Sequence, residues 1–290
     1  MYRAKFALLL ILFLFISIRS YSQDVIKYVV AVLPTPVLNT SDFSSVFGGE
    51  SGMEVKRDDQ GLIRELEFVA LPNTLFKVYE VIQMGDHDIF RITTEDYPYS
   101  SSDLYIDSRF VKNGGGMTLD RDHTMPSKAD ILSRLNELNG YQYMWGGNYA
   151  EGVAQLMEYY IPSSDVDEGL KKQWCLEGVD CSGLIYQATD GNTPRNTSSL
   201  VYYGEAVDIQ GKTPEEIADL IEPLDFIVWK GHLIIALNDS TTIESSNPEG
   251  VHKTPLIERL YSVMGSRIPV NDYDTEMDGL KFVVRRWINN

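Results

Sequence analysis

Cys181 is the residue of this sequence best placed to act as a nucleophile. It lies in GVDCSGLIYQA (178–188), where Leu184, Ile185 and Ala188 have the spacing of one helix face. This pattern predicts that Cys181 lies at a helix start, where free backbone N–H groups and the positive end of the helix dipole favour the thiolate. The alternative is a small core residue, because free cysteine is among the most buried residue types.

A cysteine nucleophile needs a base within hydrogen-bond reach, and His232 is the candidate base. It opens the apolar run HLIIAL directly after Gly231, so its ring can project from the edge of a rigid strand. Considered alone, His232 could equally be a structural histidine at a strand start. The other histidines are expected in a turn, a linker and a loop: His87, His123 and His252.

Glu244 is the candidate for the third group, which would orient the base. It lies in the run TTIES, and the turn Asn238–Ser240 predicts a hairpin with the strand of His232. If the loop has an odd number of residues, Glu244 shares a face with His232 and lies diagonally across from it. With an even number, Glu244 points away. In the first arrangement its carboxylate would hold the imidazole tautomer and stabilise the imidazolium.

No metal or cofactor site is predicted, because the scattered histidines and the two cysteines lack the ligand spacing that is typical of zinc. The two cysteines, Cys175 and Cys181, could form a disulfide in an exported protein, and that bond would block the nucleophile. We expect Cys175 to be a structural thiol instead.

The elements that must position these residues differ between the two halves of the chain. The first half is predicted to be all-β, a small barrel of short strands separated by turns. The second half combines helices with a block of β-rich runs, which is typical of an α+β domain. Strands are expected at 28–33, 63–71, 75–83, 88–94, 104–111, 225–229, 232–237, 241–245 and 281–288. Helices are expected at 128–138 with Ser127 as N-cap, around 152–160, from Cys181 and from Pro214.

Two other segments bear on a cleft. In YQYMWGGN (141–148), paired glycines let the backbone approach another surface closely, so Tyr143 and Trp145 either line a cleft or form an aromatic core corner. Arg195, in the loop TPRNTSSL, is either a surface charge or an anion contact in that cleft.

Composition and the first residues predict a folded, exported protein. Hydrophobic residues make up 43% of 290 residues, enough for a packed core. The net charge of −17 argues against non-specific binding to nucleic acid or anionic membrane surfaces. Residues 1–22 have the basic, apolar and small-residue parts of a secretory signal peptide, with cleavage expected before Gln23. An uncleaved anchor is the alternative, but the apolar run is short for a membrane span.

The order of these motifs resembles the NlpC/p60 family of cysteine peptidases, which have a papain-like fold and act on bacterial cell-wall peptides. The resemblance covers roughly residues 128–290 and rests on YMWGG, DCSGLIYQA, PRNTSS, EPLDFIVW, GHLIIAL and the IES strand. With it, the chain divides into a signal peptide (1–22), a module similar to bacterial SH3-like barrels with a linker (23–125), and an NlpC/p60 catalytic domain (126–290).

By this resemblance, Cys181 is the nucleophile, His232 its base and Glu244 the third polar residue. The family's third residue is more commonly histidine, asparagine or glutamine, so Glu244 departs from the usual choice. A full negative charge is expected to raise the pKa of His232 further than a neutral partner would.

The resemblance also implies a binding pocket for a peptide's free amino end. Tyr143, Asp180 and Ser182 match the positions that line this pocket in family members that carry SH3-like modules. Asp180 could pair with an ammonium group, cap the helix, or do both. The long insertion Asn148–Val179 departs from the family pattern and could form a cleft wall or a lid.

The implied activity is that of a periplasmic or extracellular cysteine endopeptidase, without cofactor, metal, nucleic-acid partner or stable membrane span. It would cleave the γ-D-glutamyl to L-diamino acid bond of murein (peptidoglycan) stem peptides with a free N-terminal L-Ala, a role in murein recycling. The alternatives are an amidase or acyltransferase on the same scaffold, or a non-catalytic cell-wall-binding protein. The intact set of cysteine, histidine and acid argues against the last.

Overall fold

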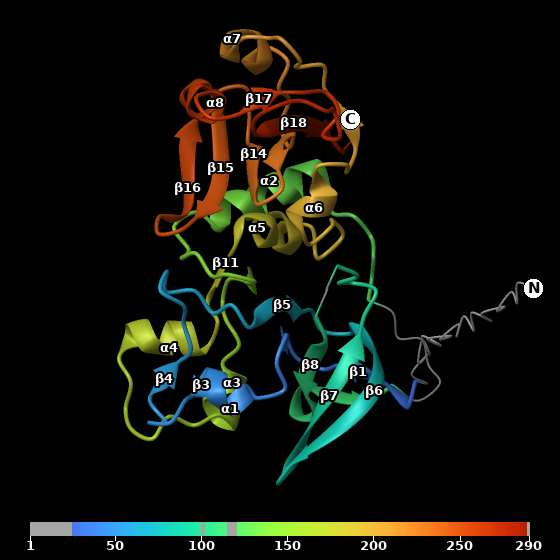
Figure 1. Cartoon of the computed structure of the whole chain (residues 1–290), viewed down its shortest axis with the longest axis vertical. Coiled ribbons are helices and arrows are strands. Elements are labelled where there is room, and N and C mark those ends of the chain that lie inside the picture. The colour runs from blue at the N-terminus through green and yellow to red at the C-terminus, as the bar shows by residue number, and fades with distance from the viewer. Residues whose placement is uncertain (1–24, 100–101, 115–120, 289–290) are drawn as a thin grey trace, which may run out of the picture.

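The fold contains two seven-stranded sheets, one in each half of the chain (Figure 1). It is seen in a computed structural model, which describes residues 25–99, 102–114 and 121–288. The predicted signal peptide and part of the predicted linker lie outside these residues. Within the described ranges, no helix is long and apolar enough to cross a membrane.

The first sheet is antiparallel throughout its described pairs. Its strand order is β5 (Leu66–Ala70), β2 (Thr35–Leu38), β8 (Leu104–Asp107), β7 (His87–Thr93), β6 (Leu75–Met84), β1 (Lys27–Ala31) and β9 (Val111–Asn113). Each of the five strands expected in this half overlaps one of these strands. β2 is hidden in the sequence because Pro34 and Pro36 lack the N–H that a strand normally donates. The SH3-like barrel stays a prediction.

The second sheet lies between two layers of helices. Its order is β12 (Glu205–Ala206), β18 (Lys281–Arg286), β13 (Phe226–Trp229), β14 (His232–Ala236), β15 (Thr241–Ser246) and β16 (Gly250–Pro255), with β17 (Ile268–Pro269) parallel to β18. One face packs on α2 (Lys128–Glu137), α5 (Cys181–Ala188) and α6 (Thr197–Leu200). The other packs on α7 (Pro214–Ala218) and α8 (Leu256–Met264). Helices and sheets thus form the mixed α and β protein that the sequence predicts.

Alternating side chains along the strands build the two cores. On β13, Phe226 and Val228 face the α5 layer, while Ile227 and Trp229 face the α8 layer. This alternation follows from the two-residue period of a strand, and it explains why the run is apolar throughout.

The insertion joins the two halves instead of projecting from one of them. Its elements are β10 (Asn148–Tyr149), α3 (Gln155–Tyr159), α4 (Glu168–Trp174) and β11 (Gly178–Val179). It packs on the N-terminal elements α1 (Phe43–Val46), β3 (Phe47–Gly48) and β4 (Glu54–Val55), and Figure 1 shows these segments side by side. The remaining short element is η1 (Ser108–Phe110).

Several local predictions are wrong. His252 was expected in a loop but lies on β16, and the helix α8 that follows it was not expected at all. His87 was expected in a turn but begins β7. α4 begins inside the expected acidic loop, where Asp167 accepts a hydrogen bond from the Leu170 amide.

Candidate active site

Cys181 begins helix α5, as its sequence context predicts. Asp180 caps the helix, because its Oδ1 accepts a hydrogen bond of 2.7 Å from the Gly183 amide. Gly183 in turn faces the carbonyl oxygen of Gly147, and a Cβ there would collide with it. The Cys181 side chain is a free thiol and is mostly buried, as is that of Cys175.

His232 and Glu244 meet on neighbouring strands. Ala236 pairs with Thr242 across the hairpin, which leaves an odd number of residues between them. This register places Glu244 on the same face as His232 and diagonally across from it. His232 Nε2 lies 2.6 Å from Glu244 Oε2. The condition that the sequence left open is therefore met.

The pKa of His232 reflects both of its partners. Burial by itself would lower the pKa, but hydrogen bonds to Cys181 and Glu244, together with their charges, raise it to about 9. Burial would raise the pKa of Glu244, but hydrogen bonds from His232 and Arg259 and their charges lower it to about 2. At neutral pH the site therefore contains an imidazolium beside a buried carboxylate.

Two further residues contact or approach Glu244, and the sequence analysis did not assign either to the site. Arg259 on α8 donates to both carboxylate oxygens, from Nε at 2.6 Å and from Nη2 at 2.8 Å. His252 on β16 lies directly opposite Glu244 in register, with its Nε2 4.0 Å from Oε1. The helical spacing of Leu256, Leu260 and Val263 could have revealed α8.

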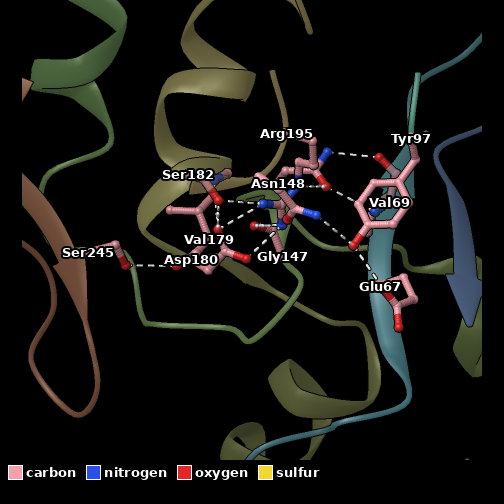
Figure 2. Close-up of polar contacts among 12 residues, drawn as sticks. Glu67, Val69, Tyr97, Gly147, Asn148, Val179, Asp180, Ser182, Arg195 and Ser245 are labelled. Carbon is pink, nitrogen blue, oxygen red and sulfur yellow. Dashed lines mark hydrogen bonds and ion pairs between the residues drawn. The ribbon is translucent and has the colours of Figure 1, made fainter. Parts of the chain in front are cut away.

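Arg195 is neither the surface charge nor the cleft contact that the sequence suggested. It is 1% exposed and lies behind Asp180, where Nη1 and Nη2 donate to the two carboxylate oxygens at 2.9 and 2.7 Å. It also donates to Ser182 Oγ and to the Gly147 carbonyl oxygen. Burial opposes the charge of Arg195, but Asp180 raises its pKa above the ordinary value. Figure 2 shows this network at the start of α5.

The ion pair changes the interpretation of Asp180. Its carboxylate is bonded to Arg195 on both oxygens and caps α5, so its negative charge is already compensated. Binding of a substrate ammonium group by Asp180 stays a prediction, and the ion pair with Arg195 weakens the argument for it. Ser182 Oγ likewise has partners within the protein, since it donates to Asp180 and accepts from Arg195.

Asn148 connects this network to the N-terminal sheet. Its side-chain amide bonds to both backbone groups of Val69, accepting from the N–H at 2.9 Å and donating to the carbonyl oxygen at 2.8 Å. Its Oδ1 also accepts from Arg195 Nε. The start of α5 is thus held against β5 by a buried amide (Figure 2).

A cavity of about 170 Å³ lies beside Cys181, and both halves of the chain line it. Its lining includes all three residues that the resemblance placed in a substrate pocket: Tyr143, Asp180 and Ser182. Trp145 also lines the cavity, and the guanidinium carbon of Arg64 lies 4.2 Å from the centroid of its ring. Burial, and next the charges of Asp180 and Cys181, raise the pKa of Tyr143. Its hydroxyl therefore stays protonated and can donate a hydrogen bond.

Glu67 lines the same cavity, and no sequence pattern pointed to it. It lies on β5, in the half of the chain where no titratable cluster was evident. Its oxygens accept from Asn39 Nδ2 at 2.9 Å and from the Tyr97 hydroxyl at 2.8 Å. Both donors are neutral, so neither compensates the negative charge of this carboxylate.

The insertion does not contribute a wall or a lid to this cavity. In the described part of the chain, none of the lining residues comes from 149–179. Nor does any group of three or more His, Cys, Asp or Glu side chains there have an arrangement that could hold a metal ion.

No protein-family model and no curated protein matches the sequence. Among solved structures, the chain is similar to an NlpC/P60 family protein from Bacillus cereus, at 14% identity and TM-score 0.34, over 90% of this chain and 63% of that one. It is similar to RipD from Mycobacterium tuberculosis, described as a non-catalytic NlpC/p60 domain protein adapted to peptidoglycan binding. The identity is 15% and the TM-score 0.33, over 56% of this chain and 97% of that one. It is also similar to NlpC2 from Trichomonas vaginalis, at 12% identity and TM-score 0.31, over 91% of this chain and 73% of that one. The chain thus spans less than two thirds of the Bacillus cereus chain.

Proposed function

We propose that this protein is an exported cysteine endopeptidase of the NlpC/p60 type. Its substrates are murein stem peptides with a free N-terminal L-Ala, which it cuts between γ-D-glutamate and the L-diamino acid. The second half is the papain-like catalytic domain, and the first half is an SH3-like module that contributes to the substrate pocket.

The observation that carries this proposal is the placement of a thiol, an imidazole and a carboxylate next to one cavity. Cys181 lies at the start of α5, Cys181 and Glu244 both raise the pKa of His232, and Glu244 Oε2 lies 2.6 Å from His232 Nε2. A nucleophile with a base and a group that orients the base is the arrangement required for acyl transfer. The motif order in the sequence, which resembles this family, supports the choice of substrate.

In the mechanism that we propose, the Cys181 thiolate attacks the γ-carbonyl carbon of the D-glutamyl residue. Backbone N–H groups near the start of α5 stabilise the resulting oxyanion. The His232 imidazolium then gives its proton to the leaving amine as the C–N bond breaks, leaving a thioester on Cys181. Next, His232 takes a proton from water, which attacks the thioester, releases the L-Ala-D-Glu product and regenerates the thiolate and imidazolium pair.

Glu67 binds the substrate's ammonium group in this proposal, in place of Asp180. The Asp180 carboxylate is compensated by Arg195, while in the described part of the chain the Glu67 carboxylate accepts hydrogen bonds from the neutral side chains of Asn39 and Tyr97. A carboxylate whose hydrogen-bond donors are neutral, in the lining of a cavity, favours a cation. Tyr143 and Asp180 shape the pocket between Glu67 and Cys181.

The experiment is mass spectrometry of the purified protein incubated with L-Ala-γ-D-Glu-diaminopimelate, beside the Cys181→Ala variant. We expect the parent protein to release L-Ala-D-Glu, and Cys181→Ala to release none. The N-acetylated peptide is the control for the free amino end, and we expect it to be cut far more slowly.

Other outcomes would redirect the proposal. Products with a transferred acyl group would indicate an acyltransferase, and cleavage at the amide that joins the peptide to the glycan would indicate an amidase. If free, N-acylated and longer stem peptides all stay intact, the peptidase proposal is wrong, and binding of intact murein becomes the activity to measure.

A further inference from the structure

Glu244 lies in an environment that is unfavourable for an unpaired charge. It is 2% exposed and sits on β15, between the strands that carry His232 and His252. A buried carboxylate with an imidazolium as its only cationic partner would bind the imidazolium proton tightly, because opposite charges attract strongly where water is excluded. A general acid that holds its proton too tightly transfers that proton slowly.

Arg259 alters this balance through a two-point contact. Its Nε and Nη2 donate to Oε1 and Oε2 of Glu244, the bidentate geometry that fixes a carboxylate most firmly. Oε2 is also the oxygen that lies 2.6 Å from His232 Nε2. One arginine therefore sets the orientation of the oxygen that His232 faces.

We propose that Arg259 is a positioning residue for the reaction: it orients Glu244 and offsets its charge, so that His232 faces a hydrogen-bond acceptor belonging to a nearly neutral pair. The Glu244 carboxylate then remains a strong hydrogen-bond acceptor for His232, while the pair of Glu244 and Arg259 together has the net charge of a neutral side chain. Arg259 does not line the cavity beside Cys181. The inference rests on the proposed function only for the identity of the reaction.

Other titratable groups face the same residues. Cys181 faces His232 from α5, and His252 approaches Glu244 Oε1 from β16. Nδ1 of His252 lies 3.0 Å from the Gly250 carbonyl oxygen, which holds its ring in place. Any test of Arg259 must therefore separate the signal of His232 from that of His252.

The test is an NMR pH titration of the full chain with isotope-labelled histidine side chains, with signals assigned through His232→Gln and His252→Gln. In Arg259→Met, removal of the positive charge is expected to raise the titration midpoint of His232 by about one unit. Arg259→Lys keeps the positive charge but loses the two-point contact of the guanidinium with Glu244. In this variant the titration midpoint of His232 is expected to stay close to that of the parent. A midpoint that is unchanged in folded Arg259→Met, or equally shifted in both variants, would overturn the inference.

A double variant keeps the test decisive if Arg259→Met folds poorly because Glu244 is left uncompensated. Glu244→Gln combined with Arg259→Met contains neither charge, so we expect it to fold and to return the His232 midpoint toward the parent value. Glu244→Gln alone leaves Arg259 unpaired beside His232 and is expected to lower the midpoint. If the double variant keeps the low midpoint of Glu244→Gln, charge compensation by Arg259 is wrong.

Kinetics provide a second readout if the peptidase activity is established. Arg259→Met should lower kcat about three- to tenfold, since a weaker acid protonates the leaving amine more slowly, and should leave KM unchanged. The titration does not depend on peptide cleavage. A shifted midpoint without cleavage would therefore reject the proposed function alone, and cleavage with an unshifted midpoint would reject the inference alone.

Discussion

At the scale of single residues, the distribution of compensated and uncompensated charge organises the site. Asp180 and Glu244 are both buried acids, and each is held on both oxygens by an arginine, Arg195 and Arg259. Each of these acids positions a residue of the reaction: Asp180 caps the helix of Cys181, and Glu244 orients the imidazole. Glu67, which accepts from neutral side chains, is the carboxylate that we propose binds a cationic substrate group.

Replacing Glu67 by glutamine tests that assignment. We expect Glu67→Gln to raise KM for the free-amino peptide about 10- to 100-fold, since a charge-assisted hydrogen bond contributes about 1.5 to 3 kcal/mol. Slow cleavage of the N-acetylated peptide should not change. Glu95→Gln is the matched control, because Glu95 is 92% exposed and pairs with Lys77 at the surface. Equal effects of Glu67→Gln on both peptides would contradict ammonium binding.

The two shifted pKa values also predict how stability depends on pH. Glu244 has its pKa lowered from 4.5 to about 2, so its contribution is fully present above pH 4.5 and is lost as pH falls toward 2. His232 has its pKa raised from 6.5 to about 9, so its contribution is fully present below pH 6.5 and is lost as pH rises through 9. The contributions of Glu244 and His232 to the free energy of unfolding are therefore both complete only between pH 4.5 and pH 6.5.

Urea unfolding at about pH 3, 5.5 and 9.5 measures this dependence. The free energy of unfolding of the parent is expected to be largest at the middle pH. His232→Gln should lose less free energy than the parent between the middle and the highest pH, and Glu244→Gln should lose less between the middle and the lowest. If both variants follow the parent's pH dependence, these two groups do not govern it.

At the scale of elements, an antiparallel meander and one close helix contact assemble the site. The strands β14, β15 and β16 are sequential neighbours, so they bring His232, Glu244 and His252 together across the sheet. Helix α8 follows β16 directly and returns over the sheet with Arg259. On the opposite face, α5 approaches the loop at Gly147 so closely that only glycine fits at position 183.

Gly183→Ala is expected to destabilise the protein by about 1 to 3 kcal/mol, although alanine favours a helix, because its Cβ would push α5 away from the Gly147 carbonyl. Displacement of α5 also moves Cys181, so alkylation of the thiol by iodoacetamide should change in rate. Gly265→Ala is the control, since Gly265 has φ −64° at the end of α8 and contacts only nearby carbonyl oxygens. It should alter stability by less than about 0.5 kcal/mol. Equal unfolding free energies for the two variants would refute the close contact.

At the scale of the whole molecule, the insertion makes the two halves share one core. Leu156, Trp174 and Leu176 of the insertion are fully buried in a cluster with Phe43 and Leu66 of the N-terminal half. The same insertion is anchored to the second half by hydrogen bonds that Arg195 donates to Asn148 and Ser245 donates to the Val179 carbonyl oxygen. The halves are therefore expected to unfold together.

Leu156→Ala should lower the free energy of unfolding by about 2 to 5 kcal/mol, because it opens a cavity in this shared core. Hydrogen exchange followed by mass spectrometry should then show faster exchange in peptides from β6 and β7 and equally in peptides from β13 and β14. Ile161→Ala is the matched control, because the Ile161 side chain is 76% exposed. It should change neither the free energy of unfolding nor the exchange rates. Faster exchange confined to the N-terminal peptides would mean that the halves unfold independently.

The local signals in this sequence were sufficient wherever the deciding interaction is short in range. Asp180 and Gly183 define the helix start at Cys181, Ser127 defines the start of α2, and apolar runs identify the strands β13 and β14. Caps, turns and hydrophobic periodicity act within a few residues, so they can be identified from the sequence. The candidates Cys181, His232 and Glu244 were chosen on this basis, and the structure brings them together.

Only the tertiary structure decided what each charge faces. Glu67, Arg195 and Arg259 are far apart in the sequence. Each of them has the local sequence pattern of an ordinary surface residue. The fold buries Arg195 behind Asp180, brings Arg259 to Glu244 and places Glu67 beside Cys181. The energy of a charge depends on its burial and on partners that are remote in the chain, and no local pattern contains either quantity.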